Sequence, residues 1–136
     1  MKVLITSVSS DSHTWNLVYL QLLLEDLRHQ TINLGACVPE TLVVREALLE
    51  RPDLIVVSSV NGHGHQQGGS YLRAVREQLP TVPMVIGGKL GTLGDRNDQF
   101  VADLLDQGFS RVFTGDDSVS AFVEYLEHLA VPVVVS

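Results

Sequence analysis

Short apolar runs alternate along this chain with longer segments in which apolar residues recur every three or four positions. The short runs predict five strands, at residues 3–8, 31–34, 53–59, 82–86 and 111–114. The periodic segments predict five helices, at residues 15–29, 39–50, 69–79, 97–107 and 118–129. Strict alternation of strands and helices predicts an α/β fold, in which helices cover both faces of a parallel sheet.

The inner strands and the helices indicate how this sheet is buried. Residues 54–57 are all apolar, which is typical of a strand that is buried on both faces. We therefore predict a single doubly wound, flavodoxin-like (Rossmann-like) domain over residues 1–136, with a five-stranded parallel sheet in the order 2-1-3-4-5. One side of each of four helices should face the core, through Leu17, Leu20, Leu24, Leu27, Val44, Ala47, Leu48, Leu72, Val75, Leu79, Val119, Phe122, Leu126 and Leu129.

The composition of the chain limits the kinds of molecule that it is expected to bind. The chain has 136 residues, 45% of them hydrophobic and 18% charged, which is enough for one ordinary core. Its net charge of −7 argues against a nucleic-acid or anionic membrane surface as partner. No secretion signal or membrane span is predicted, and the single cysteine, Cys37, excludes an internal disulfide. We expect a cytoplasmic protein.

Small and polar residues follow four of the predicted strands, in segments 9–13, 58–65, 87–94 and 115–117. In the predicted order, strands 1 and 3 flank the switch point at which open α/β sheets bind ligands. Glycine lets a flat ligand approach the backbone, and serine offers a hydroxyl without bulk. These segments predict a slot for a flat ligand, although each segment alone would also fit an ordinary turn.

The first of these segments contains the strongest candidate for metal chemistry, because Asp11 stands two residues before His13. An imidazole can bind a metal through one nitrogen while a carboxylate holds the other nitrogen and sets the tautomer. Taken alone, the pair also fits a turn aspartate beside a solvated histidine.

Three motifs at these strand ends together resemble the signature of cobalamin-binding domains: Asp11-x-His13, Ser58-x-Val60 and Gly87-Gly88. The resemblance extends over nearly the whole chain and is strongest to the small, cobalamin-binding subunits of glutamate mutase (methylaspartate mutase). Asn16 and Val60 stand where that family usually has Gly and Leu, so we interpret the chain as a divergent member.

The resemblance implies that the cofactor is adenosylcobalamin (coenzyme B12), bound base-off/His-on. In that state the cofactor's own dimethylbenzimidazole leaves cobalt, and its nucleotide tail enters the slot beside the sheet. His13 is implied as the lower axial ligand of cobalt, with Asp11 bonded to its far nitrogen. The other cofactor-binding positions implied are Ser10, Ser12, Thr14, Ser58, Ser59, Val60, Gly87, Gly88, Lys89, Leu90, Gly91, Thr92 and Gly115.

The implied activity is that of an adenosylcobalamin-dependent carbon-skeleton mutase, converting L-glutamate to threo-3-methylaspartate or rearranging a related amino acid. A dicarboxylate substrate would require clustered arginines, but the predicted crevice offers only Lys89 and Arg96. We therefore expect the substrate to be held by a larger, barrel-type partner subunit. This chain would then have no catalytic residue beyond its cobalt ligand, and would be inactive alone.

Two other function classes are kept as alternatives. One is a corrinoid carrier or cobalamin-sensing module that serves a methyltransferase or a regulator. Such carriers usually have a helical cap before the cobalamin domain, whereas the first strand here is predicted near residue 3, which favours the mutase. The other is a flavodoxin-like domain that binds a flavin or no ligand.

Three further motifs have weaker functional interpretations. His63 and His65 could form a second metal site, but a glycine-rich loop over the corrin or against a partner fits them better. Glycines 87, 88 and 91 lack the Lys-Ser/Thr of a P-loop. A receiver-type magnesium or phosphoacceptor site is disfavoured because the third strand ends in serines, although four aspartates follow the later strands: Asp95, Asp98, Asp116 and Asp117.

Overall fold

The computed structural model describes residues 1–7, 15–59, 64–88, 97–113 and 118–130 of the chain. The strands are β1 (Lys2–Ser7), β2 (Gln30–Asn33), β3 (Leu54–Ser59), β4 (Met84–Gly88) and β5 (Arg111–Phe113). The helices are α1 (Trp15–Asp26), α2 (Glu40–Glu50), α3 (Gly64–Gln78), α4 (Asn97–Gln107) and α5 (Ser118–Ala130). Strands and helices alternate along the chain, as the hydrophobic pattern predicts.

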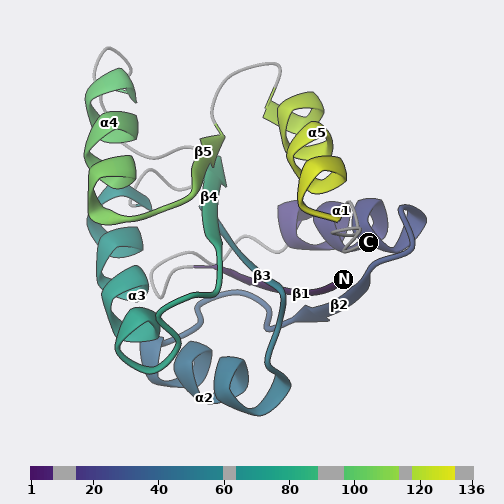
Figure 1. Ribbon diagram of the computed structural model, residues 1–136, viewed down its shortest axis with the longest axis horizontal. Helices are drawn as coiled ribbons and strands as arrows, with labels where there is room; N and C mark the ends of the chain where they lie inside the picture. The colour runs from purple at the N-terminus through teal and green to yellow at the C-terminus, as the bar shows by residue number, and fades with distance from the viewer. Residues whose placement is uncertain (8–14, 60–63, 89–96, 114–117, 131–136) are drawn as a thin grey trace, which may run out of the picture.

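The five strands form one parallel sheet in the order β2-β1-β3-β4-β5, which confirms the predicted fold class. Helices α1 and α5 cover one face of this sheet, and α2, α3 and α4 cover the other (Figure 1). Because every strand runs in the same direction, the carboxyl ends of all five meet at one edge of the sheet.

The central strands are buried on both faces because side chains along a strand point alternately to opposite sides. On β3, Val56 joins the core under α1 and α5, whereas Ile55 and Val57 join the core under α2, α3 and α4. All three are at most 5% exposed. This two-sided burial explains the continuous apolar run in the sequence.

The predicted core faces of the helices are largely confirmed. Leu17 and Leu24 of α1, and Leu126 of α5, are at most 1% exposed. On α2 the most deeply buried positions are Val43 and Ala47. The prediction is wrong for Val119, which is 40% exposed at the start of α5.

Helix α1 ends at Asp26, three residues earlier than predicted, because Arg28 adopts a left-handed conformation with φ 68°. The N–H of Arg28 donates to the Glu25 carbonyl and the N–H of His29 donates to the Leu24 carbonyl, each at 2.9 Å. This pair of bonds is the Schellman motif, which closes a helix that hydrophobic periodicity alone would continue.

Helix α3 begins at Gly64, five residues earlier than predicted, and includes Gly68 in its interior. A Cβ at Gly68 would lie 2.5 Å from Cδ1 of Ile86 on β4, so the glycine allows α3 to pack closely against the sheet. His65 therefore lies in the first turn of α3, and the prediction of a glycine-rich loop at this position is wrong.

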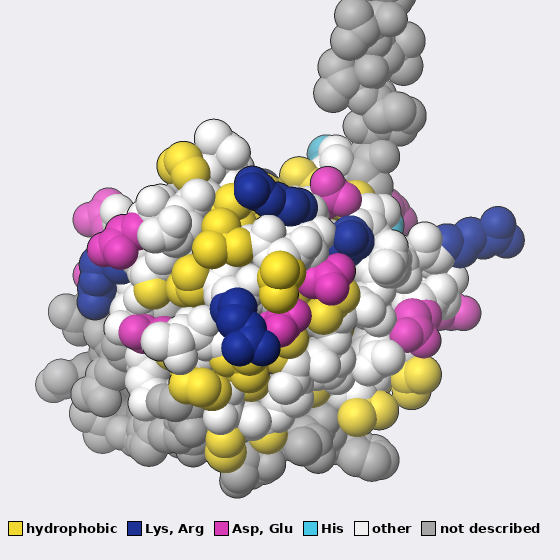
Figure 2. All heavy atoms as spheres, turned by 90° about the horizontal axis from the view of Figure 1, so that it is seen from below, with side chains coloured by type: hydrophobic (Ala, Val, Ile, Leu, Met, Phe, Trp, Pro, Cys, Tyr) yellow, Lys and Arg dark blue, Asp and Glu magenta, His cyan; other side chains and the backbone are white. Residues whose placement is uncertain are grey.

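The described residues on the side of α2 do not form a basic surface. Lys and Arg side chains there lie among Asp, Glu and hydrophobic side chains rather than gathering in one patch (Figure 2). Within the described ranges, every helix is too short or too polar to cross a membrane.

Candidate functional site

A row of small residues crosses the sheet close to the carboxyl ends of its strands. Ser7 of β1 lies opposite Ser58 of β3, and Ser58 lies opposite Gly87 of β4. Gly87 in turn lies opposite Phe113 of β5. The alternation of side chains places this row on the face covered by α1 and α5. The row therefore leaves space under these two helices at the edge where the strands end.

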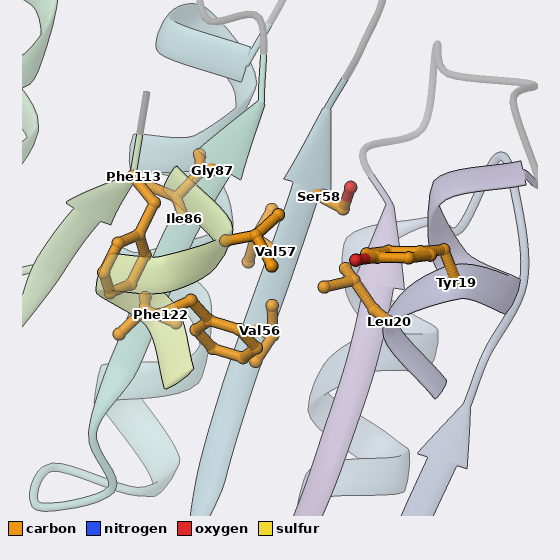
Figure 3. Close-up of a pocket in the computed structure, with 11 residues that line it drawn as sticks. Tyr19, Leu20, Val56, Val57, Ser58, Ile86, Gly87, Phe113 and Phe122 are labelled. Carbon is orange, nitrogen blue, oxygen red and sulfur yellow. The ribbon is translucent and has the colours of Figure 1, made fainter. Parts of the chain in front are cut away.

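A cavity of about 240 Å³ occupies this space, between α1 and α5 and above β3 and β4. Figure 3 shows its two sides, with Tyr19 and Leu20 of α1 facing Phe113 and Phe122 across β3. Carbon atoms form most of its wall. The lining residues are Tyr19, Leu20, Val56, Val57, Ser58, Val85, Ile86, Gly87, Phe113, Val119 and Phe122.

Ser58 is the polar side chain on the floor of this cavity. It is only 7% exposed, and its hydroxyl has no hydrogen-bond partner within the described part of the chain. A buried hydroxyl without a partner costs free energy, so proteins rarely retain one without a reason. The arrangement suits a ligand that enters the cavity and accepts or donates one hydrogen bond at Ser58.

Ser7 occupies the neighbouring position of the same row, but its hydroxyl already has a hydrogen-bond partner within the protein. Its Oγ donates to the Gly35 carbonyl at 3.1 Å, which ties β1 to the turn after β2. Gly35 has φ 89°, a left-handed conformation that glycine adopts without strain. Ser7 thus contributes to the scaffold, whereas Ser58 is free to contact a ligand.

Gly87 has a structural role that the sequence did not reveal. A Cβ at this position would lie 3.0 Å from the Phe113 carbonyl oxygen and 3.3 Å from the Phe113 Cβ. The glycine therefore lets β5 bring Phe113 against the cavity. The Phe113 ring meets the Phe122 ring edge-on, with centroids 5.5 Å apart, and this pair forms one wall.

A hydrogen-bond network holds the opposite wall in place by anchoring α1 to β2. The Asn33 amide donates to the Gln21 side-chain oxygen at 3.1 Å, and the Gln21 amide donates to Glu25 at 3.0 Å. The Thr31 hydroxyl also donates to Glu25, at 3.1 Å. Gln21 directly follows Leu20 and Glu25 lies about one turn further on, so these bonds hold in place the helix that presents Tyr19 and Leu20 to the cavity.

A comparison with known protein families places most of the chain in one of them. Residues 1–108 match the family described as the B12 binding domain. The chain belongs to the B12-binding domain family. The match confirms the resemblance seen in the three sequence motifs, and it supports a role in cobalamin binding.

Two relatives of this B12-binding domain are glutamate mutase subunits. The glutamate mutase sigma subunit of Fusobacterium nucleatum is 26% identical over 117 residues, which cover 82% of this chain and 83% of the relative. Sigma subunit 2 of glutamate mutase from Haloarcula marismortui is 25% identical over 125 residues, covering 92% of this chain and 84% of the relative.

Solved structures share the fold at low sequence identity. A cobalamin-binding protein from Desulfitobacterium hafniense matches with a TM-score of 0.74 and 15% identity, over 94% of this chain and 58% of that protein. A CheY-like protein from Pseudomonas aeruginosa matches with a TM-score of 0.69 and 14% identity, over 98% and 96% of the two chains. Fold likeness alone therefore does not distinguish a cobalamin site from a receiver domain.

The structure brings two of the predicted site residues, Ser58 and Gly87, to the cavity. Ser59 and Gly88 end β3 and β4, beside these two residues. The other predicted site residues lie outside the described ranges: Ser10, Asp11, Ser12, His13, Thr14, Val60, Lys89, Leu90, Gly91, Thr92 and Gly115. All of them belong to segments that follow the carboxyl ends of β1, β3, β4 and β5.

The candidate metal ligand, His13, also lies outside those ranges. Within the part of the chain that the structure describes, no group of three or more His, Cys, Asp or Glu side chains is arranged to hold a metal ion. The prediction that cobalt is bound through His13 therefore stays a prediction.

Sequence reasoning missed the residues that form the two cavity walls, Tyr19, Leu20, Phe113, Val119 and Phe122. Leu20, Val119 and Phe122 were predicted only as core residues. Helix α1 is apolar on nearly every side, with Val18, Tyr19 and Leu22 at least 45% exposed, so its periodicity does not show which side meets a ligand. Val119, which is 40% exposed, lines the cavity instead of packing in the core.

Proposed function

We propose that this B12-binding domain is the cobalamin-binding subunit of an adenosylcobalamin-dependent carbon-skeleton mutase of the glutamate mutase type. Its relatives among glutamate mutase sigma subunits support the reaction class. The single observation that supports the binding mode is the cavity between α1 and α5, on whose floor the Ser58 hydroxyl has no hydrogen-bond partner among the described residues.

The chemistry of this cavity fits the nucleotide tail of cobalamin. The tail ends in dimethylbenzimidazole, a flat bicyclic base that exposes one ring nitrogen when it is not bound to cobalt. Apolar walls suit the carbon surface of such a base, and the Ser58 hydroxyl can donate to the single nitrogen. The base thereby receives one hydrogen bond, and the buried hydroxyl gains a partner.

In this proposal the segments that follow the strands would hold the rest of the cofactor. His13, in the segment after β1, would bind cobalt, and Asp11 would accept a hydrogen bond from its other ring nitrogen and raise its donor strength. Residues 89–92 and Gly115 would contact the nucleotide tail. When bound, adenosylcobalamin supplies the radical chemistry of the rearrangement.

A larger, barrel-type subunit would hold the substrate, L-glutamate or a related amino acid. Among the described residues that line the cavity, no side chain is charged, so nothing there would bind two carboxylates. Recognition of a dicarboxylate calls for arginines in bidentate geometry. This chain would therefore bind and orient the cofactor and be inactive alone.

The proposal is tested by replacing His13 with alanine. The full chain is mixed with adenosylcobalamin and a glutamate-mutase-type large subunit, and 3-methylaspartate is measured. We expect His13→Ala to lower product formation by at least about tenfold, because cobalt loses its protein ligand. The wild-type complex should also show a base-off/His-on absorbance spectrum that the variant lacks.

The matched control is His128→Ala, since His128 is exposed on α5 and its imidazole Nδ1 lies 2.9 Å from the carbonyl oxygen of Glu124 on the same helix. This variant should form product at the wild-type rate. Failure of the wild-type chain to take up cobalamin would refute the proposal. Uptake of cobalamin without rearrangement by the reconstituted pair would instead favour a corrinoid carrier or cobalamin-sensing module.

A further inference from the structure

Helix α1 exposes apolar side chains on its outer side. Val18 and Leu22, which lie one turn apart, are 45% and 61% exposed, and Tyr19 is 50% exposed. Of the six large hydrophobic side chains that are exposed in the described part of the chain, three are on this helix. Single exposed apolar side chains are common on proteins, whereas a group of them is typical of an interaction surface. We call Val18, Tyr19 and Leu22 the α1 patch.

An apolar segment of the same chain starts near this patch. Helix α5 ends at Ala130 and is followed by residues 131–136, with the sequence Val-Pro-Val-Val-Val-Ser. Helices that join parallel strands run back along the sheet, so α1 and α5 both end at the edge where the strands begin (Figure 1). Leu129, in the last turn of α5, packs against the same core as Leu23 and Leu27, near the end of α1. The segment after Ala130 therefore starts close to the end of α1.

We propose that residues 131–136 dock on the α1 patch in an extended conformation. Alternate side chains of an extended chain point the same way and lie about 6.6 Å apart. Residues four apart on a helix lie about 6 Å apart along its axis. Because the two spacings match, Val133 would cover Leu22 while Val135 covers Val18. The inference concerns the outer side of α1 and does not depend on the proposed function.

The length of the segment is sufficient for this contact. From Asp26, where α1 ends, back to Val18 the helix rises about 12 Å. Six extended residues span about 20 Å, so the segment can pass Leu22 and reach Val18. Attachment to the same chain gives the segment an effective concentration in the millimolar range, which favours it over a separate protein at micromolar concentration.

The charge of the chain disfavours a second copy as the occupant of the patch. Each copy has a net charge of −7. Glu25 and Asp26, both exposed, follow Leu22 by three and four residues and so lie on the same side of α1. Two copies that met at this helix would therefore bring like charges together. Residues 131–136 contain no ionisable side chain, so their docking meets no such repulsion.

The test is disulfide formation between two introduced cysteines in the full-length chain. Cys37→Ser first removes the single native thiol, and Leu22→Cys is then combined with Val133→Cys. The matched control combines Leu49→Cys with Val133→Cys, because Leu49 is 69% exposed on α2, on the other face of the sheet. We expect the first pair to form an intramolecular disulfide at least about tenfold faster than the control, since the bond requires Cα atoms within about 7 Å.

Thermal unfolding of the full-length chain provides a second measurement. Leu22→Ala should lower the melting temperature by about 2–4 °C, because it removes part of the covered surface. In a chain that already contains Val133→Asp and Val135→Asp, the same change should have little effect, because its contact is lost. Ser136→Asp adds a charge without removing a valine, so in that background Leu22→Ala should have its full effect.

The outcomes distinguish the possible occupants of the patch. A disulfide that joins two chains through position 22 would assign the patch to a second copy and overturn the inference. Equal rates of oxidation for the two cysteine pairs would also overturn it, as would equal effects of Leu22→Ala with and without the aspartates. Neither measurement involves the cofactor, so each of these results leaves the proposed function unchanged.

Discussion

The two faces of the sheet are covered to different degrees. On the face under α2, α3 and α4, Gly68 allows α3 to approach so closely that a Cβ there would lie 2.5 Å from Ile86. On the other face, α1 and α5 lie apart over β3 and β4 and leave a cavity of about 240 Å³. The small residues Ser58 and Gly87 form its floor where the strands end.

This difference shows that small residues serve opposite purposes on the two faces. Gly68 is small so that a helix can fill the space above it, whereas Ser58 is small and the space above it stays open. Interiors of proteins are normally packed to crystal-like density, so an open apolar cavity beside a hydroxyl that has no partner among the described residues is typical of a binding site. We call the face under α2, α3 and α4 the closed face, and the face under α1 and α5, which contains the cavity, the open face.

The largest expected effect is a difference in stability between a leucine-to-alanine change on the closed face and the same change on the open face. Leu72, on α3 of the closed face, is 1% exposed, and Leu72→Ala should lower the free energy of unfolding by about 2–5 kcal/mol. Leu20 already borders a cavity and is partly exposed, so Leu20→Ala should cost only about 1–2 kcal/mol. Urea unfolding of both variants measures the difference, and equal losses would show that the open face is packed as tightly as the closed one.

A smaller effect is expected when Ser7 and Ser58, which lie opposite each other on β1 and β3, are each replaced by alanine. Ser58→Ala removes a hydroxyl that has no partner in the described part of the chain, so the free energy of unfolding should stay the same or rise slightly, while cobalamin binding weakens by about 3- to 10-fold. Ser7→Ala removes the bond to the Gly35 carbonyl and should lower the free energy of unfolding by about 1 kcal/mol.

Thermal unfolding and cobalamin titration of the two serine variants provide the check. Ser7 does not line the cavity, so Ser7→Ala should bind cobalamin as the wild type does. If Ser58→Ala destabilised the apo chain as much as Ser7→Ala, the Ser58 hydroxyl would have a partner within the protein rather than one supplied by a ligand.

The smallest effect concerns the edge of the sheet opposite the cavity. There, burial and the nearby amino-terminal ammonium of Met1, 3.1 Å from the imidazole, lower the pKa of His29 below its ordinary value of 6.5. Above pH 6.5 the imidazole is neutral in both the folded and the unfolded chain, so it adds no pH dependence. Below that pH the unfolded chain takes up the proton first, and stability falls as the pH falls toward the lowered pKa.

Thermal unfolding of the apo chain between pH 7 and pH 5 tests this expectation, with His29→Gln as the comparison. The variant should lose less of its melting temperature over this range than the wild type does. Parallel melting curves for the two proteins would mean that His29 titrates alike in the folded and unfolded chains.

Much of the fold was predictable because it depends on patterns that are local in the sequence. The apolar run at 54–57 predicts a strand buried on both faces, and the structure buries Ile55, Val56 and Val57 there. The helix ends were less predictable. The left-handed Arg28 that closes α1 and the early start of α3 at Gly64 both depend on backbone conformation and packing that hydrophobic periodicity does not encode.

By itself, the sequence determined the alternation of elements, the strand order and the three motifs that place the chain in the B12-binding domain family. Only the tertiary structure decided that α1 and α5 leave a cavity between them and that Phe113 and Phe122 form its wall. It also decided that the Ser7 hydroxyl bonds to Gly35, whereas the Ser58 hydroxyl has no partner within the described ranges. The physical reason is that hydrophobic periodicity reports which side of an element is buried. The space between two elements depends instead on how closely residues distant in the sequence can approach, which periodicity does not record.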